Sequence, residues 1–130
     1  MFRWVEHTAE LELELDGPTE AAVFEEAFAA LKELIDNSSG PPMTHEVEVE
    51  ADEPALLLVE WLSELVYLAE TEQFVPERIG SLALGAGRLR ATIEGHRGEP
   101  SQLVKAVTLH RLEFRPDDTV GWRARVVLDV

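Results

Sequence analysis

Two short segments in the first half of the chain alternate strictly between polar and apolar residues. Residues 10–15 read Glu-Leu-Glu-Leu-Glu-Leu, and residues 45–50 read His-Glu-Val-Glu-Val-Glu. Because successive side chains of a strand point to opposite faces of a sheet, each segment predicts a strand with one face in the core and one in water. Both predicted strands carry a row of glutamates on the solvent side.

An amphipathic helix is predicted after the first of these strands. Residues 16–18 (Asp-Gly-Pro) turn the chain, Thr19 can cap the helix, and residues 37–42 (Asn-Ser-Ser-Gly-Pro-Pro) end it. The apolar residues between recur at three- and four-residue spacing, as on one face of a helix: Val23, Phe24, Ala27, Phe28, Leu31, Leu34 and Ile35.

A second helix is expected after the second strand, with Asp52 and Pro54 in its first turn and an end at about Thr71. Apolar residues cover most of its circumference. The narrow polar stripe that remains consists of Glu60, Ser63, Glu64 and Tyr67. A helix that is apolar nearly all round is buried on most sides, so we expect this helix to be sandwiched in the core.

Beyond Pro76, strand-like segments alternate with turn-rich ones. The expected strands are residues 79–84, 88–94, 105–114 and 122–130, separated by residues 85–87, 95–100 and 116–121. Short connections between successive strands favour hairpins. The expected order is therefore strand, helix, strand, helix and four strands: an α+β fold with two helices packed on a mixed β-sheet, in a single domain of residues 1–130.

The acidic composition narrows the classes of partner. Eleven Lys and Arg residues against 26 Asp and Glu residues give a formal net charge of −15. Such a charge repels a phosphate backbone, so we expect no direct binding of nucleic acid. A basic protein surface or divalent cations would be attracted instead. The plainer alternative is that most of the acids serve solubility.

The absence of cysteine excludes disulfides, cysteine-ligated zinc, iron–sulfur clusters and thiol nucleophiles. No signal peptide is visible, and the most apolar run, Ala55–Val59, is far too short to cross a bilayer. We therefore expect a cytoplasmic protein without membrane association.

Acidic and basic residues are predicted to occupy different strands. The two early strands carry glutamates, whereas most arginines lie on the late ones: Arg88, Arg90, Arg111, Arg123 and Arg125. Like charges placed directly opposite one another destabilise a sheet. We therefore expect an arginine-bearing late strand, rather than the second glutamate strand, beside residues 10–15.

Alternation in the last expected strand places Asp129 on the face that carries Arg123 and Arg125. An exposed salt bridge is the ordinary interpretation of such an aspartate. However, the terminal carboxylate at Val130 is only one residue away, and calcium and magnesium prefer several carboxylate and carbonyl oxygens. A metal site at this end of the strand is the second interpretation.

Other chemical signatures are weak. His7 and His110 belong to no His-Glu-x-x-His arrangement, and we interpret both as structural; no serine stands in a Gly-x-Ser-x-Gly elbow. Residues 85–87 (Gly-Ala-Gly) precede a strand, which favours a hairpin turn over a phosphate loop. Glu60 and Glu64, one helical turn apart, could hold a metal, but such pairs more often form a solvated stripe.

Three segments together carry a family pattern. Glu6-His7-Thr8-Ala9-Glu10 opens the first strand, Lys105-Ala106-Val107-Thr108-Leu109-His110 lies in a late strand, and residues 121–130 (Gly-Trp-Arg-Ala-Arg-Val-Val-Leu-Asp-Val) close the chain. In order and spacing they resemble the archease family, small proteins that assist the RtcB-type RNA-splicing ligase. The resemblance runs nearly end to end and includes the Trp-Leu-x-Glu-Leu core of the second helix. Leu109 stands where the family usually has Tyr.

The resemblance implies an activator of an RNA ligase rather than an enzyme. Family members promote guanylylation of the active-site histidine of the ligase and allow repeated turnover. The ligase joins a 2′,3′-cyclic phosphate or 3′-phosphate end to a 5′-hydroxyl end in tRNA splicing or RNA repair. The implied partner of this chain is therefore an RtcB-type RNA ligase.

The resemblance also implies a divalent metal site. The family binds the metal through an Asp that ends a His-Thr-Ala-Asp motif, a second Asp near the C-terminus and the adjacent main chain; Glu10, Asp129 and Val130 match these positions. Calcium is the first expectation, with magnesium or manganese as alternatives. Glu10 replaces the usual Asp, and its added methylene can shift a ligand by more than a metal tolerates. Lys105 and His7 join Glu10 and Asp129 as candidates for activating the partner.

Two other functions stay open at the level of the sequence. One is a metal-binding or chaperone-like module without a ligase partner. The other is an independent acid–base hydrolase that uses Glu10 with Asp129, which would require a pocket and a carboxylate with a raised pKa.

Overall fold

The computed structural model describes every residue from Met1 to Val130. It contains two helices and seven strands, which confirms the α+β class with two helices. In chain order the elements are β1 (Phe2–His7), β2 (Glu10–Gly17), α1 (Glu20–Ile35), β3 (Pro42–Glu50), α2 (Pro54–Thr71), β4 (Phe74–Gly85), β5 (Arg88–Arg97), β6 (Ala106–Asp117) and β7 (Gly121–Asp129). Neither helix is long and apolar enough to span a membrane.

The larger sheet has the strand order β1-β2-β7-β6, and all its neighbouring strands are antiparallel. β2 and β7 form its centre, so the last strand of the chain lies beside the second. Their alternating apolar residues face the core, where Leu13 pairs with Val126 and both are fully buried. The alternation read from the sequence thus determines which face of this sheet is buried.

The smaller sheet has the order β3-β5-β4 and is also antiparallel throughout. The β4–β5 hairpin turns at Ala86 and Gly87, and Gly87 has a φ of 71°. Glycine adopts this left-handed conformation without a steric penalty. The hairpin turn predicted for residues 85–87 is therefore confirmed.

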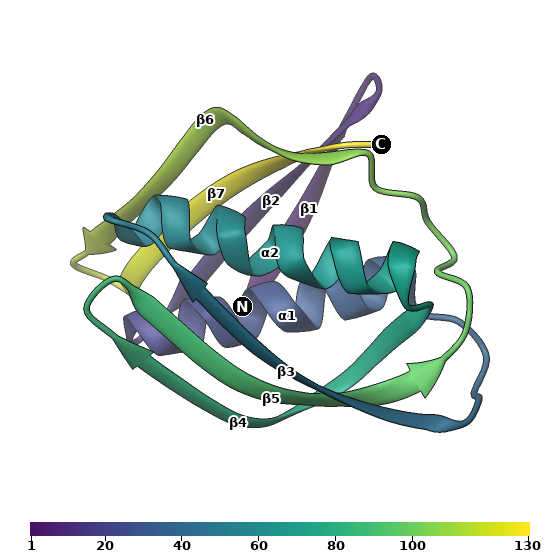
Figure 1. The fold of residues 1–130 in the computed structure, drawn as a ribbon. Helices are drawn as coiled ribbons and strands as arrows, with labels where there is room; N and C mark the ends of the chain where they lie inside the picture. The colour runs from purple at the N-terminus through teal and green to yellow at the C-terminus, as the bar shows by residue number, and fades with distance from the viewer.

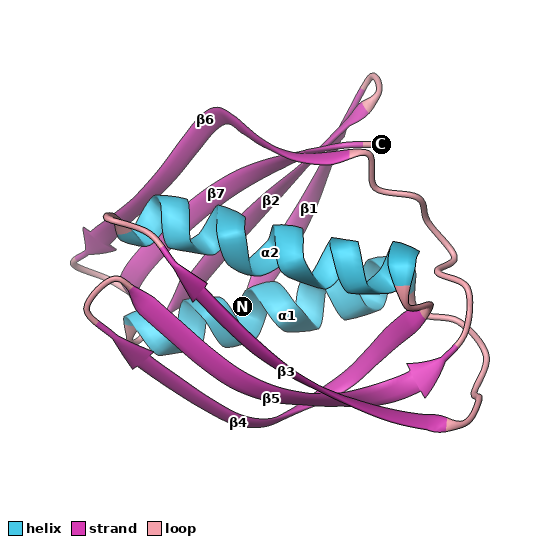
Figure 2. Ribbon diagram, viewed as in Figure 1, coloured by secondary structure: helices cyan, strands magenta, loops and turns pink.

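Both helices lie between the two sheets, as Figures 1 and 2 show. α1 packs mainly on β2 and also contacts β4 of the smaller sheet, whereas α2 packs on β6 from one side and on β3 and β4 of the smaller sheet from the other. The molecule therefore has three layers, and the expectation that the second helix is sandwiched in the core is confirmed.

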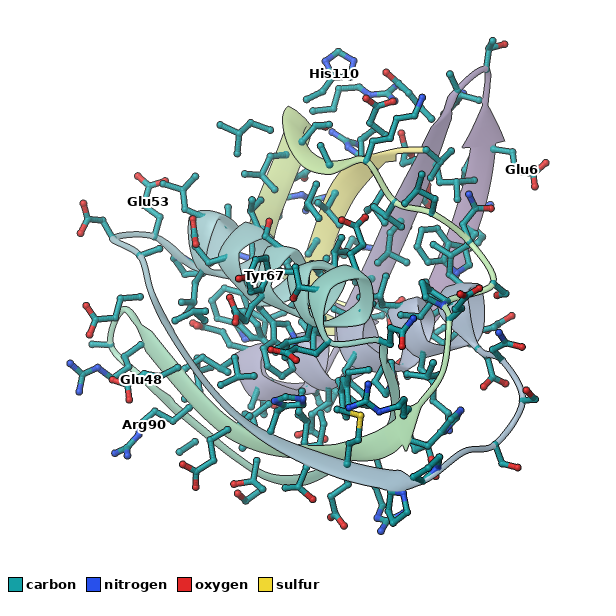
Figure 3. All side chains as sticks on the ribbon, turned by 45° about the vertical axis from the view of Figure 1, so that its right-hand side comes forward. Glu6, Glu48, Glu53, Tyr67, Arg90 and His110 are labelled. Carbon is teal, nitrogen blue, oxygen red and sulfur yellow. The ribbon has the colours of Figure 1, made fainter.

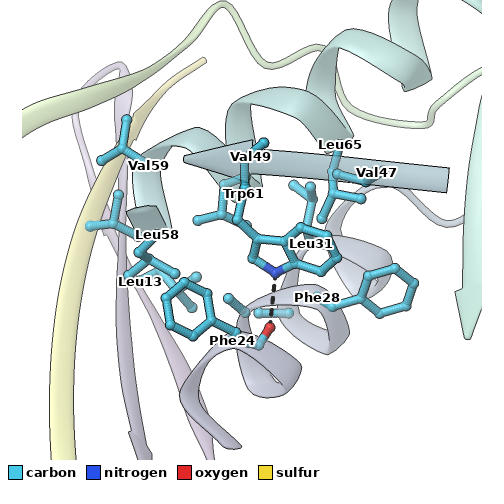
Figure 4. Close-up of a cluster of buried hydrophobic side chains, with 14 of the residues drawn as sticks. Leu13, Phe24, Phe28, Leu31, Val47, Val49, Leu58, Val59, Trp61 and Leu65 are labelled. Carbon is cyan, nitrogen blue, oxygen red and sulfur yellow. Dashed lines mark hydrogen bonds between the residues drawn. The ribbon is translucent and has the colours of Figure 1, made fainter. Parts of the chain in front are cut away.

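The indole of Trp61 lies at the centre of the middle layer (Figure 4). Trp61 is fully buried, and its Nε1 donates a hydrogen bond of 3.0 Å to the main-chain oxygen of Phe24. The ring of Phe28 stacks on it with a centroid separation of 6.1 Å. Because the polar N–H is satisfied, this large apolar surface can be buried without an orphan donor.

The predicted cap of the first helix is present: the hydroxyl of Thr19 accepts a 3.1 Å hydrogen bond from the main-chain nitrogen of Ala22. The second helix begins at Pro54. Proline lacks an N–H, but the N–H at the first position of a helix has no partner within the helix, so no hydrogen bond is lost.

Two details of the predicted arrangement are corrected. The single mixed sheet is replaced by two antiparallel sheets, because the helices pack between them and bury an apolar face of each. In addition, residues 6–10 do not open one continuous strand: Thr8 and Ala9 form the turn between β1 and β2. Ala9 has a φ of 60°, a left-handed conformation that Gly or Asn would have indicated in the sequence but Ala does not.

The predicted separation of the glutamate strands is confirmed. β2 pairs with the arginine-bearing β7, which places Glu14 opposite Arg125. β3 lies in the other sheet, where Glu48 faces Arg90 of β5. Figure 3 shows Glu48 and Arg90 pointing out from the smaller sheet.

Candidate functional site

The polar residues on the outer face of the larger sheet form rows that cross its strands. Directly paired residues of antiparallel strands point to the same face. The row at one end consists of His7, Glu10, Asp129 and Ala106, and the next row consists of Val5, Glu12, Val127 and Thr108. Strands from both ends of the sequence thus bring His7, Glu10 and Asp129 into one row.

Glu10 of β2 and Asp129 of β7 are direct partners in this register. Main-chain hydrogen bonds fix the surrounding backbone: Lys105 N donates to Asp129 O at 2.8 Å, and Val130 N donates to Ala9 O at 3.3 Å. Figure 1 shows the end of β7 near the β1–β2 turn. The five residues singled out from the sequence, including His7, therefore lie together at one end of the sheet.

Asp129 does not form the salt bridge that is the ordinary interpretation of its position. The two arginines on its face of β7 bind other acids: Arg123 Nε lies 2.7 Å from Asp117 Oδ2, and Arg125 Nη2 lies 3.0 Å from Glu113 Oε2. The negative charges of Glu10 and Asp129 therefore stand opposite each other without a cation from β7.

Glu12 and Arg111 extend the cluster beyond the residues predicted from the sequence. Glu12 is only 8% exposed. Arg111 Nη2 lies 3.0 Å from Glu12 Oε1 and 3.7 Å from Glu10 Oε2, and His7 Nε2 lies 3.7 Å from Glu12 Oε1. Arg111 thus holds the one mostly buried glutamate of the group and also reaches Glu10.

A bulge in β6 brings Arg111 to this position. The pairing with β7 jumps from Thr108–Val127 to Glu113–Arg125, so residues 109–112 oppose a single residue of β7. Figure 3 shows His110 projecting outward at this bulge. A bulge redirects side chains away from the regular alternation of a strand. The alternation places Glu12 on the face of Glu10, but no sequence signal marks the bulge that adds Arg111.

A hollow of about 400 Å³ opens beside the cluster, between the β1–β2 hairpin and α1. Half of its lining residues are polar, and both His7 and Glu10 border it. Its lining consists of Trp4, Glu6, His7, Glu10, Leu11, Leu34, Gln102 and Val130. A partner side chain or a small hydrated group can therefore approach His7 and Glu10 from this side.

The donors at this end suit a hard divalent cation. Carboxylates of Glu10 and Asp129 share a face, with the main chain of Val130 next to them. No three His, Cys, Asp or Glu side chains are close enough to hold a metal together. Main-chain oxygens and water would have to complete the roughly six to eight oxygens that calcium takes. An all-oxygen set fits calcium, magnesium or manganese better than zinc.

At the opposite end of the same face, the negative charge of Asp117 is compensated. Asp117 accepts hydrogen bonds from Arg123 and from the main-chain nitrogens of Thr119 and Val120, at 2.7, 2.8 and 3.1 Å. These donors lower the pKa of Asp117 from 3.8 to about 2, with the Arg123 hydrogen bond as the largest cause. The same pair raises the pKa of Arg123.

The remaining sequence candidates lie away from this cluster. Glu60 and Glu64 are on the polar stripe of α2 and belong to no group of metal-binding side chains. His110 is exposed, and its main-chain nitrogen donates to the hydroxyl of Thr108 at 3.3 Å. Neither feature adds a second site.

Comparison with known proteins identifies a family over nearly the whole chain. Residues 2–130 match the model of the Archease protein family. An archease of Pyrobaculum neutrophilum is 34% identical over 142 residues, which cover 99% of this chain and 95% of the relative. An archease of Archaeoglobus fulgidus is 31% identical, covering 99% of this chain and 98% of the relative.

Two solved structures share the fold. The solution structure of a Methanobacterium thermoautotrophicum protein has a TM-score of 0.70 and 26% identity, covering 99% of this chain and 98% of that one. The crystal structure of a Thermotoga maritima archease, described as a possible chaperone, has a TM-score of 0.72 and 24% identity, covering 100% and 98%. With the family match and the relatives above 30% identity, these findings show that the chain belongs to the archease family.

Proposed function

We propose that this chain is an accessory protein that activates an RtcB-type RNA ligase. It promotes GTP-dependent guanylylation of the ligase and multiple turnover in tRNA splicing or RNA repair, and it is not itself the enzyme. The observation that carries the proposal is the Glu10–Asp129 pair: strands from opposite ends of an archease-family chain bring two carboxylates together without a cation from β7.

The charge of the chain supports a protein partner that binds RNA. A ligase that grips RNA offers a basic surface, and a chain with a net charge of −15 is steered toward such a surface. On contact, Glu10 and Asp129 present fixed negative charge, and the exposed Lys105 next to them offers a cation to a phosphate group. His7, bordering the hollow beside Glu10, is placed to contact the same partner group.

A divalent cation belongs to the proposal, with calcium as the first choice and magnesium or manganese as alternatives. Glu10, Asp129 and the main chain of Val130 would hold it. When bound, it supplies positive charge that can orient an anionic group of the partner or its nucleotide.

The proposal is tested by ligase guanylylation with GTP and manganese, in the presence and absence of this chain. Asp129→Asn is expected to reduce the stimulation by about 10-fold to 100-fold, as loss of a supporting carboxylate at a metal site does. Asp118→Asn is the matched control, because Asp118 is an exposed acid in the β6–β7 turn. Equal stimulation by folded Asp129→Asn and wild-type proteins would contradict the proposal.

A second candidate function is a metal-binding or chaperone-like module without a ligase partner. The observation that favours it is the exposure of two leucines near the cluster, Leu103 at 58% and Leu109 at 62%. Exposed apolar side chains of this kind can contact unfolded chains. Suppression of aggregation of an unrelated protein, together with unchanged ligase guanylylation, would select this function instead.

A further inference from the structure

Arg111 contacts two glutamates of β2, Glu10 and Glu12. Its Nη2 atom is 3.0 Å from Glu12 and 3.7 Å from Glu10. The Glu12 side chain is 11% exposed, whereas those of Glu10 and Arg111 are 39% and 40% exposed. The guanidinium is therefore anchored on a buried carboxylate and extends to a more accessible one.

The anchoring on Glu12 has a physical reason. A carboxylate removed from water requires a counter-charge, and the loss of its partner leaves an uncompensated buried charge. An arginine keeps its charge throughout the physiological pH range. Arg111 is consequently the counter-charge that the buried Glu12 requires.

The backbone of the β6 bulge holds Arg111 in this orientation. Arg111 has a φ of 53°, and Arg125 Nε donates a 2.9 Å hydrogen bond to its main-chain oxygen. Arg125 is itself held by Glu113 at 3.0 Å. A non-glycine residue with positive φ persists where surrounding contacts determine it. The positive charge above Glu10 is thus built into the fold.

We infer that Arg111 is a tethered counter-ion that competes with a divalent cation for Glu10. The inference rests on the cation site proposed above. A cation bound by Glu10 lies close to the guanidinium, and at about 5 Å in water-like surroundings the repulsion between the two charges weakens binding about tenfold. Arg111 therefore keeps the affinity of the free protein low, and cation binding draws its guanidinium away from Glu10 toward Glu12.

Calorimetric titration of the full chain with calcium chloride near physiological ionic strength tests the inference. Arg111→Gln is expected to bind calcium about tenfold more tightly than wild type, and Glu10→Gln to lose the binding. Arg115→Gln is the matched control. It removes the same charge from β6, but about 20 Å along the sheet from the Glu10 row, which exceeds the screening length of about 8–10 Å near physiological salt.

A second measurement uses the wild-type protein alone, so it does not depend on how well a variant folds. The side-chain Nε–H resonance of Arg111, followed by NMR during the calcium titration, is expected to shift with the same midpoint as the calorimetric signal. The corresponding resonance of Arg115 is expected to stay in place.

The possible outcomes separate this inference from the site on which it rests. Calcium binding that Glu10→Gln removes, but that Arg111→Gln leaves equal or weaker, overturns the role of Arg111 and retains the cation site. Absence of any binding that depends on Glu10, in wild type and in Arg111→Gln, overturns both the cation site and the inference. A tenfold gain in Arg115→Gln as well would show a general charge effect and also overturn the inference.

Discussion

The two sheets treat charge on their outer faces differently. In the smaller sheet, acids of β3 stand opposite arginines of β5: Glu48 faces Arg90, and Glu50 faces Arg88. Arg88 Nη2 lies 2.6 Å from Glu50, and these contacts raise the pKa of Arg88. The larger sheet also pairs opposite charges at Glu14–Arg125, but like charges face each other where Glu10 pairs with Asp129 and where Arg115 pairs with Arg123.

The difference identifies a position at which the fold retains an unfavourable pair of like charges. Cross-strand pairs of opposite charge stabilise a sheet modestly, and like charges directly opposite destabilise it by a similar amount. The two paired arginines each contact an acid, Arg115 contacting Glu113 and Arg123 contacting Asp117. Asp129 forms no ion pair, so the Glu10–Asp129 row is where a partner or a cation can supply the missing charge. This comparison makes the Glu10–Asp129 row stand out more clearly than the overall acidity does.

Loss of Arg125 is expected to lower stability most, because Arg125 pairs with the opposite charge of Glu14 and also contacts the β6 bulge. Arg125→Ala removes its contacts with Glu113 and with the main-chain oxygen of Arg111. We expect the free energy of unfolding in urea to fall by about 1.5 kcal/mol. Arg78→Ala, which removes an exposed pair with Glu94, is the control and should lower it by less than about 0.5 kcal/mol. Equal losses would show that the bulge needs no anchor.

Reversing one charge in the smaller sheet is expected to create a like-charge pair there, as Glu10 and Asp129 form in the larger sheet. Arg90→Glu places like charges opposite at Glu48, and we expect a loss of about 1 kcal/mol in urea unfolding. Arg90→Gln removes the ion pair without adding repulsion and should lose roughly half as much. Identical results for the two variants would mean that cross-strand repulsion contributes nothing measurable.

Neutralising the exceptional row should stabilise the protein. Glu10→Gln removes a charge from the row with Asp129, and a gain of about 0.5 kcal/mol in the free energy of unfolding is expected. Glu12→Gln, two residues along the same strand, should instead destabilise the protein, because Glu12 is buried against Arg111. A loss of stability in Glu10→Gln would show that its contact with Arg111 outweighs the repulsion.

The compensated end of the larger sheet is expected to lose its contribution to stability in acid. The pKa of Asp117 is lowered to about 2 in the folded protein, below its ordinary value of 3.8. Its contribution to stability is therefore present above about pH 4 and is lost as the pH falls toward 2. Asp117→Asn should unfold at lower urea than wild type at pH 5, and the difference should disappear near pH 2. A difference that persists at pH 2 would assign it to packing rather than charge.

Local patterning predicted most of the fold. The alternation of residues 10–15 and 45–50 and the apolar face of the first helix each specify one element, because a single period decides which side is buried. Charge matching also predicted that an arginine-bearing late strand, and not β3, lies beside β2; the structure shows that this strand is β7. The number of sheets could not be predicted, because it depends on how two helices share the core with both.

The cluster was predicted only in part. Glu10 and Asp129 were singled out, and the register brings them together; their role toward a metal or a ligase stays a prediction. Arg111 and the β1–β2 turn were missed for one reason. Arg111 and Ala9 have φ values of 53° and 60°, and neither residue type signals a left-handed backbone as Gly or Asn does.

The pairing of β2 with β7 has a consequence for the order of folding. The β4–β5 hairpin needs only neighbouring residues, whereas the centre of the larger sheet joins residue 10 to residue 129. Contacts between distant residues form slowly, since the entropy of closing a long loop is lost before they form. The β4–β5 hairpin can therefore form early, whereas the carboxylate pair forms only when the two ends of the chain come together. Amide hydrogen exchange on the β2–β7 bonds thus reports in one measurement whether the carboxylate pair has formed.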